Sequence, residues 1–451
     1  MCYIDRMAIT QSQPAARTGL ELKLAERTAR VTIVGLGYVG LPLAVEVAKS
    51  GLTVTGLEVS AEKVAHVSSG KSDIDDINDS VLAPLVQSKK LSATLDASIL
   101  KDADCVVICV PTPLSKTKDP DVTYIVNAVD ALVPHLHMDM LVVLESTTYP
   151  GTTEELIRPK LEASGLTVGK DFYLAFSPER VDPGNVRFGI HNTPRIVGGT
   201  TPACTRVARA FYEIFLETVV SVSSTQAAET VKLLENTFRS VNIGLVNEVA
   251  LMCDRLGLDV WEIIEAADSK PFGFMKFYPG PGLGGHCIPI DPHYWSWKLR
   301  SLNYYARFIE LAGDINAHMP EYIVERVARV LNEDAKSLRG ATMLVLGVAY
   351  KRDISDVRES PSLDVIHLLR QRGAAVSYVD PYIPDVTLED GTEMRAVALT
   401  DAALKAADCV VILTDHTDFD YTHICATAQM VFDSRNATRD VPPGTGRVWK
   451  L

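Results

Sequence analysis

A glycine motif between a short strand and a helix is the feature that most constrains the fold of this chain. β-Branched residues at Val31–Val34 predict a strand, GLGYVG follows at residues 35–40, and an apolar helix runs through Lys49. Gly51 is a helix stop, and a second strand spans Thr53–Leu57. A βαβ unit of this kind, about 30 residues long, joins two parallel strands through a helix. The first part of the chain is therefore predicted to be α/β.

Three further apolar runs predict more strands in the same sheet. They lie at Asp104–Val110, Met140–Leu144 and Phe172–Phe176, and helical stretches separate them. Parallel strands that are buried on both faces have continuous apolar runs of this kind. We therefore expect a parallel, doubly wound sheet.

Helical periodicity replaces the strand signal between about Ser221 and Met319. Apolar residues recur there at intervals of three and four, which places them on one stripe of a long helix. This stripe consists of Val231, Leu234, Phe238, Val241 and Leu245. A different, polar stripe consists of Lys232, Asn236, Arg239 and Ser240.

The α/β pattern returns after Asn332. We expect a strand at Met343–Leu346, a helix near Ser362–Arg370 and a strand at Ala375–Val379 that ends on Asp380. This half resembles the first one. In the first half a strand ends on Glu58 and a later run reads DADCVVICVPT, and in the second half the strand that ends on Asp380 is followed by a run that reads AADCVVILTDH.

The predicted fold class is therefore α/β, with two Rossmann-like parallel-sheet domains joined by a central helical segment. Residues 1–29 are expected to form a polar N-terminal extension that contributes nothing to a core. The first Rossmann domain then covers residues 30–220, the central helical domain 221–320, and the second Rossmann-like domain 321–451.

Charge and composition exclude several classes of partner. The chain has 44 Lys and Arg against 57 Asp and Glu, and its formal net charge of −13 would repel a nucleic-acid backbone. No stretch reaches the roughly 18 uninterrupted apolar residues of a membrane span, and the N-terminus lacks the apolar region of a signal peptide. We expect a cytoplasmic protein without nucleic-acid or membrane partners.

The glycine motif and the residue that ends the second strand indicate a dinucleotide. In G-x-G-x-x-G the glycines permit a tight turn, a close approach of the backbone to a pyrophosphate, and close helix packing. Glu58, about 20 residues further on, can accept hydrogen bonds from both ribose hydroxyls of NAD and would repel the 2′-phosphate of NADP. The sequence therefore favours NAD.

Cys287 differs in setting from the other seven cysteines, which are scattered without CxxC or zinc-finger spacing and predict free thiols and no metal site. It follows a loop with four glycines and two prolines at residues 279–285, whose backbone can lie against a ligand. Pro289 and Pro292 both suit the first turn of a following helix, so Cys287 would precede a helix N-terminus, where the thiolate is favoured. Asp291 can then lie on the same side and reach the thiol or a water.

Two further groups have an open interpretation on residue chemistry alone. Lys232 and Asn236 are four residues apart on the helix and can stabilise a developing alkoxide, or they can form a solvated face. The turn of the second half carries Lys351, Arg352 and Arg358 where the first half has glycines. Such cations suit a phosphorylated ligand, although loop charges are often only solvated.

The assembled motifs resemble the UDP-glucose/GDP-mannose dehydrogenase family, and within it the UDP-N-acetylhexosamine branch. The resemblance runs from about Val31 to Arg435. It is carried by GLGYVGLPLA, VPTPL (110–114), EST (145–147), SPERVDPG (177–184), KLLEN (232–236), GPGLGGHCIPIDP, VAYKRDISDVRESPS (348–362) and DSRN (433–436).

The resemblance implies an NAD-dependent four-electron oxidation of a sugar-nucleotide C6 hydroxyl to a carboxylate, with a product used for polysaccharide precursors. Cys287 would be the nucleophile, Lys232 and Asn236 would stabilise the alkoxide, and Asp291, Glu179 and Thr147 would position a water. The implied NAD site consists of Gly35, Gly37, Tyr38, Val39, Gly40, Glu58, Lys63, Thr112, Thr147 and Arg358. The implied sugar-nucleotide site consists of Glu179, Arg180, Lys232, Asn236, Arg239, Tyr278, Gly280, Gly282, Tyr350, Lys351 and Arg435. The family also implies a homodimer formed through the central helix.

UDP-N-acetylglucosamine is the expected substrate, with UDP-N-acetylmannosamine and UDP-glucose as alternatives for the same chemistry. The glycine loop leaves room for a 2-acetamido group, and Tyr278 offers an apolar face to its methyl. A two-electron dehydrogenase of the 3-hydroxyacid type also pairs a Rossmann domain with Lys and Asn four apart, but it needs neither Cys287 nor a second nucleotide lobe. A non-catalytic nucleotide-binding regulator would have no use for Cys287, Lys232 and Asp291 together.

Overall fold

The computed structural model describes residues 18–451 except 75–76, 115–118, 182–186 and 286. The chain divides into two compact units. The first consists of the residues up to Thr112 together with Val122–Glu229, and the second of Pro113–Asp121 together with Thr230–Leu451. Each unit is built around its own β-sheet.

The first unit contains an eight-stranded sheet in the order β3-β2-β1-β4-β5-β6-β7-β8. The strands are β1 (Arg30–Val34), β2 (Thr53–Leu57), β3 (Leu91–Thr94), β4 (Cys105–Ile108), β5 (Leu141–Leu144), β6 (Tyr173–Phe176), β7 (Arg195–Gly199) and β8 (Val219–Ser221). They pair in parallel from β3 to β6 as expected, whereas β7 runs antiparallel to β6. The parallel prediction is wrong there because the described part of the β6–β7 connection contains no crossover helix.

Helices of the first unit connect these strands. They are α1 (Gly19–Ala25), α2 (Gly40–Lys49), α3 (Ala61–Ser68), α4 (Asp79–Gln87), α5 (Thr123–Leu132), α6 (Arg158–Glu162) and α7 (Pro202–Tyr212). Two 3₁₀ turns, η1 (Ala97–Asp102) and η2 (Val133–His135), and one π turn, η3 (Thr153–Ile157), complete the set.

Helix α1 corrects the expectation that residues 1–29 contribute nothing to a core. Thr18 and Glu21 form a capping box at its N-terminus. Leu20 and Leu24 are each only 1% exposed, and α1 packs against α7. This stretch is therefore part of the first unit, whereas residues 1–17 lie outside the described part of the chain.

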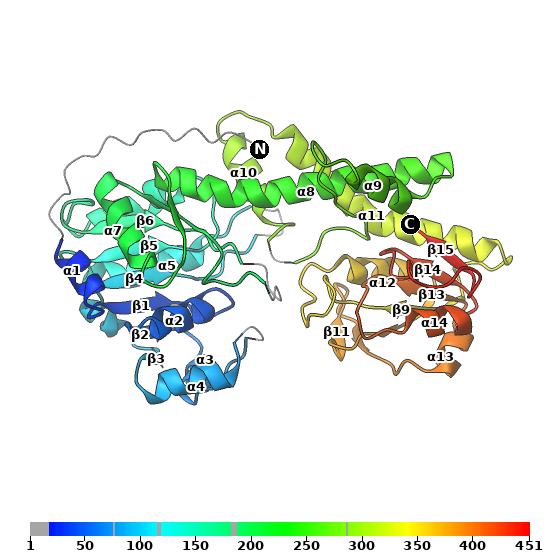
Figure 1. Cartoon of the computed structure of the whole chain (residues 1–451), viewed down its shortest axis with the longest axis horizontal. Helices are drawn as coiled ribbons and strands as arrows, with labels where there is room; N and C mark the ends of the chain where they lie inside the picture. Colours follow the sequence, from blue (N-terminus) through cyan, green and yellow to red (C-terminus); the bar gives the residue numbers. More distant parts are fainter. Residues whose placement is uncertain (1–17, 75–76, 115–118, 182–186, 286) are drawn as a thin grey trace. The chain divides into compact units, whose positions relative to one another are not determined.

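The long helix α8 (Thr225–Leu256) is labelled in Figure 1. It has a buried polar face and exposed apolar residues. Lys232, Asn236 and Ser240 are buried, whereas Leu234 and Phe238 of the apolar stripe are about half exposed. The helical character predicted for this stretch is confirmed, since α8 is followed by α9 (Val260–Asp268), α10 (Asp291–Arg300) and α11 (Arg307–Asn332). None of the described helices is long and apolar enough to cross a membrane.

The second unit contains a five-stranded parallel sheet in the order β10-β9-β13-β14-β15. Its strands are β9 (Thr342–Leu346), β10 (Ala375–Val379), β13 (Cys409–Ile412), β14 (Val431–Asp433) and β15 (Val448–Lys450), and β11 (Asp385–Thr387) pairs separately with β12 (Glu393–Arg395). Helix α12 (Pro361–Gln371) packs with α11 on one face of the sheet, and α13 (Asp401–Ala406) and α14 (Tyr421–Thr427) pack on the other (Figure 1). The predicted fold class, with two Rossmann-like sheets and helices between them in sequence, is confirmed.

Candidate active site

The glycine turn after β1 has the geometry of a dinucleotide-binding turn. Gly35 has a φ of +91°, and a Cβ on Gly40 would lie 1.8 Å from the Gly35 carbonyl oxygen, so neither position accepts a side chain. A Cβ on Gly37 would meet no atom within 4 Å. The backbone at Gly37 therefore faces open space at the start of α2, where helix N–H groups favour an anion such as a pyrophosphate.

Glu58 holds a fixed position beside this turn. Its carboxylate accepts hydrogen bonds from the backbone N–H of Leu36 at 2.9 Å and of Val59 at 2.8 Å. Because these donors belong to the turn itself and to the end of β2, the negative charge is held at the place where the ribose of a dinucleotide lies in this fold. The described residues therefore fit NAD, which would be held by the turn backbone and Glu58.

The other residues implied for NAD binding divide between the two units. Tyr38, Val39, Lys63, Thr112 and Thr147 all belong to the first unit. Arg358 belongs to the second unit, where its guanidinium pairs with Asp356 at 2.7 Å and its carbonyl accepts the N–H of Gly285 at 3.0 Å.

Three polar side chains implied for catalysis come together in the second unit. The carboxylate of Asp291 is 2% exposed and accepts a hydrogen bond from Asn236 Nδ2 at 2.5 Å. Burial raises the pKa of Asp291 to about 6, and the nearby Lys232 ammonium and the Asn236 hydrogen bond oppose this rise. Lys232 and Asn236 are 7% and 8% exposed, so the solvated-face interpretation of this pair is wrong.

Cys287 lies at the start of the turn that leads into α10. Its carbonyl accepts the N–H of Asp291 at 2.8 Å, so the chain already turns in a helical sense before the helix begins at Asp291. Pro292 occupies the first turn of α10 as predicted, whereas Pro289 precedes the helix. The Cys287 side chain is partly exposed, which suits a thiol that must meet a substrate.

The glycine loop before Cys287 packs tightly against residues that follow strands β9 and β14 of the second sheet. A Cβ on Gly280 would lie 2.6 Å from Arg435 Nη1, and a Cβ on Gly285 would lie 2.9 Å from the Tyr350 ring. The N–H of Gly280 donates to Asn247 Oδ1 of α8 at 2.9 Å. The loop therefore contacts two residues implied for sugar-nucleotide binding, Arg435 at Gly280 and Tyr350 at Gly285. Gly282 lies on the same loop and has a φ of +141°.

The remaining residues implied for substrate binding have other surroundings. Arg180 lies in the first unit and donates to the carbonyl of Pro194 at 2.5 Å. In the second unit, Arg239 is exposed on α8 and Lys351 is partly exposed after β9. Tyr278 donates its hydroxyl to Glu265 of α9 and its ring lies 5.8 Å from that of Trp261.

A buried charged cluster around Glu179 was missed in the sequence. Arg195, at the start of β7, forms ion pairs with Glu179 and Glu145, both at 3.3 Å. The Tyr212 hydroxyl donates to Glu145. Glu145 and Glu179 both lie in motifs that were recognised, but a lone arginine at a strand start carries no local pattern.

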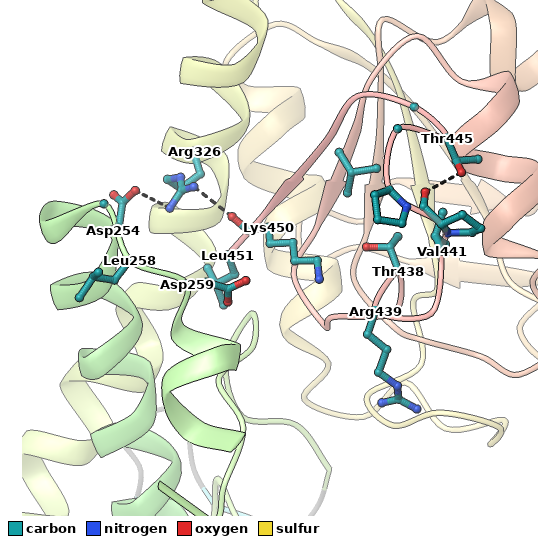
Figure 2. A pocket seen from close by; sticks show the side chains of 16 residues that line it. Asp254, Leu258, Asp259, Arg326, Thr438, Arg439, Val441, Thr445, Lys450 and Leu451 are labelled. Carbon is teal, nitrogen blue, oxygen red and sulfur yellow. Dashed lines mark hydrogen bonds and ion pairs between the residues drawn. The ribbon is translucent and has the colours of Figure 1, made fainter. Parts of the chain in front are cut away.

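A cavity of about 660 Å³ in the second unit contains none of the residues implied for the site. The turn between α8 and α9 and the C-terminal residues 438–451 line it, and Figure 2 shows Arg326 bonded to Asp254 and to the carbonyl of Lys450. The charge of Arg326 is paired with that of Asp254.

Comparison with known proteins identifies the family. Models of the UDP-glucose/GDP-mannose dehydrogenase family match residues 29–216 (NAD binding domain), 226–318 (central domain) and 344–440 (UDP binding domain).

Curated relatives and solved structures agree with these matches. UDP-N-acetyl-D-mannosamine dehydrogenase of Methanococcus maripaludis strain C7 is 36% identical over 420 residues, covering 90% of this chain and 92% of the relative. UDP-N-acetyl-D-glucosamine 6-dehydrogenase of Pseudomonas aeruginosa is 33% identical over 393 residues, covering 86% and 91%. The solved UDP-D-ManNAc dehydrogenase of Pyrococcus horikoshii has a TM-score of 0.85 and 33% identity, covering 94% of this chain and 99% of that one. The chain therefore belongs to the UDP-glucose/GDP-mannose dehydrogenase family and is an NAD-dependent UDP-sugar dehydrogenase.

Proposed function

We propose that the enzyme oxidises the C6 hydroxyl of a UDP-N-acetylhexosamine to a carboxylate in two steps, with Cys287 as covalent nucleophile. The observation that carries this proposal is the buried group of Asp291, Asn236 and Lys232 on the same unit as Cys287, with Asp291 four residues after the thiol. A carboxylate, a cation and an amide donor are the groups that an alcohol oxidation through an alkoxide needs.

The first step removes the hydroxyl proton and two electrons from C6. Bound NAD accepts the hydride in each of the two steps. Lys232 and Asn236 offer a cation and an N–H donor to the developing alkoxide. Asp291 takes up the proton through a water, for which a carboxyl with a pKa of about 6 is well matched near neutral pH.

The second step passes through a covalent bond to Cys287. The thiolate adds to the C6 aldehyde and gives a thiohemiacetal, and its oxidation leaves a thioester. Water then cleaves the thioester and frees the thiol, and we assign Asp291, Glu179 and Thr147 to the positioning of this water. One alcohol, one water and two NAD⁺ give one carboxylate, two NADH and three protons.

Within this substrate class we propose UDP-N-acetylglucosamine, and UDP-N-acetylmannosamine is the second candidate. The relatives support a sugar that carries a 2-acetamido group, since those of Methanococcus maripaludis and Pseudomonas aeruginosa are both named for N-acetylated UDP-sugars. The space expected beside the glycine loop is already filled by protein, because a Cβ on Gly280 would meet Arg435 and a Cβ on Gly285 would meet Tyr350. The manno epimer is favoured by relatives, since the 36% identical protein of Methanococcus maripaludis is named a UDP-N-acetyl-D-mannosamine dehydrogenase. The Pseudomonas aeruginosa relative, named for the gluco epimer, supports the first choice.

We further propose a homodimer formed through α8. Leu234, Phe238, Leu245 and Met252 follow one another at four and seven residues and are 46–54% exposed. An apolar stripe of this length on a helix is typical of a helix-packing interface. The α10–α11 segment adds exposed Tyr304, Tyr305, Phe308 and Leu311 in the same unit. A second copy of the chain is the occupant that the family resemblance implies.

We also propose a three-domain division, in which the first domain begins at α1 rather than at residue 30, because Leu20 and Leu24 are buried there, and the next two domains cover residues 221–320 and 321–451. We further propose the cytoplasm as the place of action. No disulfide bond joins the cysteines in the described part of the chain. A covalent mechanism through Cys287 requires a reduced thiol, and a reducing compartment maintains one. A UDP-linked uronate made there is a precursor for polysaccharide synthesis.

The experiment is a side-by-side assay of NADH release with four UDP-sugars: N-acetylglucosamine, N-acetylmannosamine, N-acetylgalactosamine and glucose. We expect the highest kcat/KM with UDP-N-acetylglucosamine. A higher value with the manno epimer would transfer the proposal to the second candidate. A highest value with UDP-glucose would refute the N-acetylhexosamine assignment.

A further inference from the structure

Arg195 joins two carboxylates in the interior of the first unit. Its side chain is 4% exposed. Nη2 donates to Glu179 Oε2 at 3.3 Å, and Nη1 donates to Glu145 Oε2 at 3.3 Å and to the Pro178 carbonyl at 3.0 Å. The guanidinium thus contacts both the Glu179 carboxylate and the backbone that carries it.

The antiparallel pair of β6 and β7 brings these residues together. Phe176 is paired with Gly198, so continuation of this register past the end of β6 brings residue 179 opposite residue 195. Ser177 donates its hydroxyl to the Ile196 carbonyl at 2.8 Å, in agreement with this register. Glu179 is therefore held at the carboxyl edge of the sheet by its neighbour strand.

Glu145 and Tyr212 fix the guanidinium from the other side. Glu145 directly follows β5, has a fully buried side chain, and accepts the Tyr212 hydroxyl hydrogen bond. The guanidinium carbon lies 5.5 Å from the centre of the Tyr212 ring. Burial raises the pKa of Glu145 to about 7, and the Arg195 charge opposes this rise. Burial disfavours the charged form of Arg195, but the two carboxylates outweigh this effect and raise its pKa, so the guanidinium stays charged.

The other oxygen of Glu179 is held by its own backbone. Oε1 accepts the N–H of Arg180 at 2.7 Å and of Val181 at 2.6 Å. Arg195 and these two donors together fix both oxygens of a carboxylate whose side chain is only 13% exposed. Such a group has one orientation and is ready to accept a hydrogen bond from a water.

We propose that Arg195 is a positioning residue that aligns Glu179 for water activation in thioester hydrolysis, with Glu145 and Tyr212 holding Arg195 in place. This inference rests on the role assigned to Glu179 in the proposed function. Lysine at this position keeps the charge but lacks the fork that spans two carboxylates and a carbonyl.

Arg195→Lys tests the inference. We expect kcat to fall by about 10²-fold while KM for NAD stays unchanged, since misplacement of a catalytic group by about 1 Å has effects of this size. Enzyme quenched during turnover should carry the UDP-sugar acyl group on Cys287, detected by intact-protein mass spectrometry, because hydrolysis has become the slow step. Arg206→Lys, on α7 in an exposed ion pair with Glu21, is the matched control and should behave as wild type.

A double-substitution cycle separates positioning from a merely structural role. If Arg195 acts through Glu179, the loss of kcat in Arg195→Lys with Glu179→Gln equals the loss in Glu179→Gln alone. If the two losses multiply, or if Arg195→Lys has wild-type kcat, the inference is overturned. Should Arg195→Lys fail to fold, Arg195→Met with Glu145→Gln removes the cation and the second carboxylate together, and the same adduct measurement applies.

The outcome also distinguishes the inference from the proposed function. If the wild-type enzyme releases NADH but none of the variants carries an adduct on Cys287, the positioning role is overturned and the oxidation is kept. A wild-type enzyme that releases no NADH with any of the four UDP-sugars overturns both.

Discussion

The Asp291 carboxylate accepts a hydrogen bond from the Asn236 amide at 2.5 Å, across 55 residues of sequence. Asn236 belongs to α8 and Asp291 is the first residue of α10. The contact joins the buried polar face of the long helix to the turn that carries Cys287. It places a motif on one helix beside a motif on another.

The acid limb of the pH–rate profile should report Asp291. Its pKa of about 6 predicts that kcat falls as the pH drops below about 6, because the carboxyl becomes protonated and no longer accepts a proton. The Asn236 hydrogen bond lowers this pKa, so Asn236→Ala should move the limb to higher pH as well as reduce kcat. A limb that stays in place in Asn236→Ala would contradict the assignment.

Asp291 also predicts a pH dependence of stability. Its folded-state pKa of about 6 lies above the ordinary value of 3.8, so its contribution is fully present below the ordinary value and is lost as the pH rises through about 6. Urea unfolding of wild type and of a Lys232→Met variant should therefore diverge between pH 4 and 7, with Lys232→Met losing more stability as the pH rises. If the free energy of unfolding has the same dependence on pH in both proteins, Lys232 does not stabilise the ionised carboxylate.

Cys287→Ser should retain binding of both ligands and lose net turnover to the acid. A hydroxyl at this position does not provide a nucleophile of thiolate strength, and the expected loss is about 10³-fold or more in kcat. Cys253→Ser, a buried cysteine on α8 that the mechanism does not use, is the control. A Cys287→Ser enzyme that makes uronate at a near wild-type rate would end the covalent mechanism.

Glu58→Ala should reduce the preference for NAD over NADP. The carboxylate is fixed by the N–H groups of Leu36 and Val59 and would face the 2′-phosphate directly. We expect the ratio of kcat/KM values to shrink at least about tenfold, or about 1.4 kcal/mol. Glu62→Ala, an exposed position on α3, should leave the ratio unchanged. An unchanged ratio in Glu58→Ala would assign the choice to another residue.

Charge on the apolar stripe of α8 should separate the proposed dimer. Phe238→Asp with Leu245→Asp places two carboxylates in a surface that would be buried between copies, and buried unpaired charge is strongly unfavourable. We expect a monomer by light scattering after size-exclusion chromatography. Leu95→Asp, at an exposed apolar position of the first unit, should stay dimeric. A wild-type monomer, or a dimer that survives the double substitution, would contradict the proposed interface.

Local patterns predict most of the sheets, and pairing direction is where they fail. The bounds predicted for the strands at Thr53–Leu57 and Ala375–Val379 are those of β2 and β10, because both segments are rich in β-branched or aromatic residues. Strand β7 has the same kind of composition but pairs antiparallel, which depends on the connection before it. Helix α1 was missed although Thr18 and Glu21 provide a capping box.

Local patterns also fail to show which site residues the fold brings together. Motif spacing identifies Asp291 and Asn236 separately, and only the fold shows that one accepts a hydrogen bond from the other. Amphipathicity misleads on α8, since most of its polar stripe (Lys232, Asn236 and Ser240) is buried and much of its apolar stripe (Leu234, Phe238 and Leu245) is exposed. Arg195 has no local signal, because its role depends on a register that brings it beside Glu179.

The number of NADH molecules formed per UDP-sugar consumed tests the central claim most directly. With UDP-N-acetylglucosamine limiting and NAD in excess, we predict two NADH per substrate and a uronate as product, with no free aldehyde released. A ratio of one, with an aldehyde as product, would contradict a covalent four-electron oxidation through Cys287.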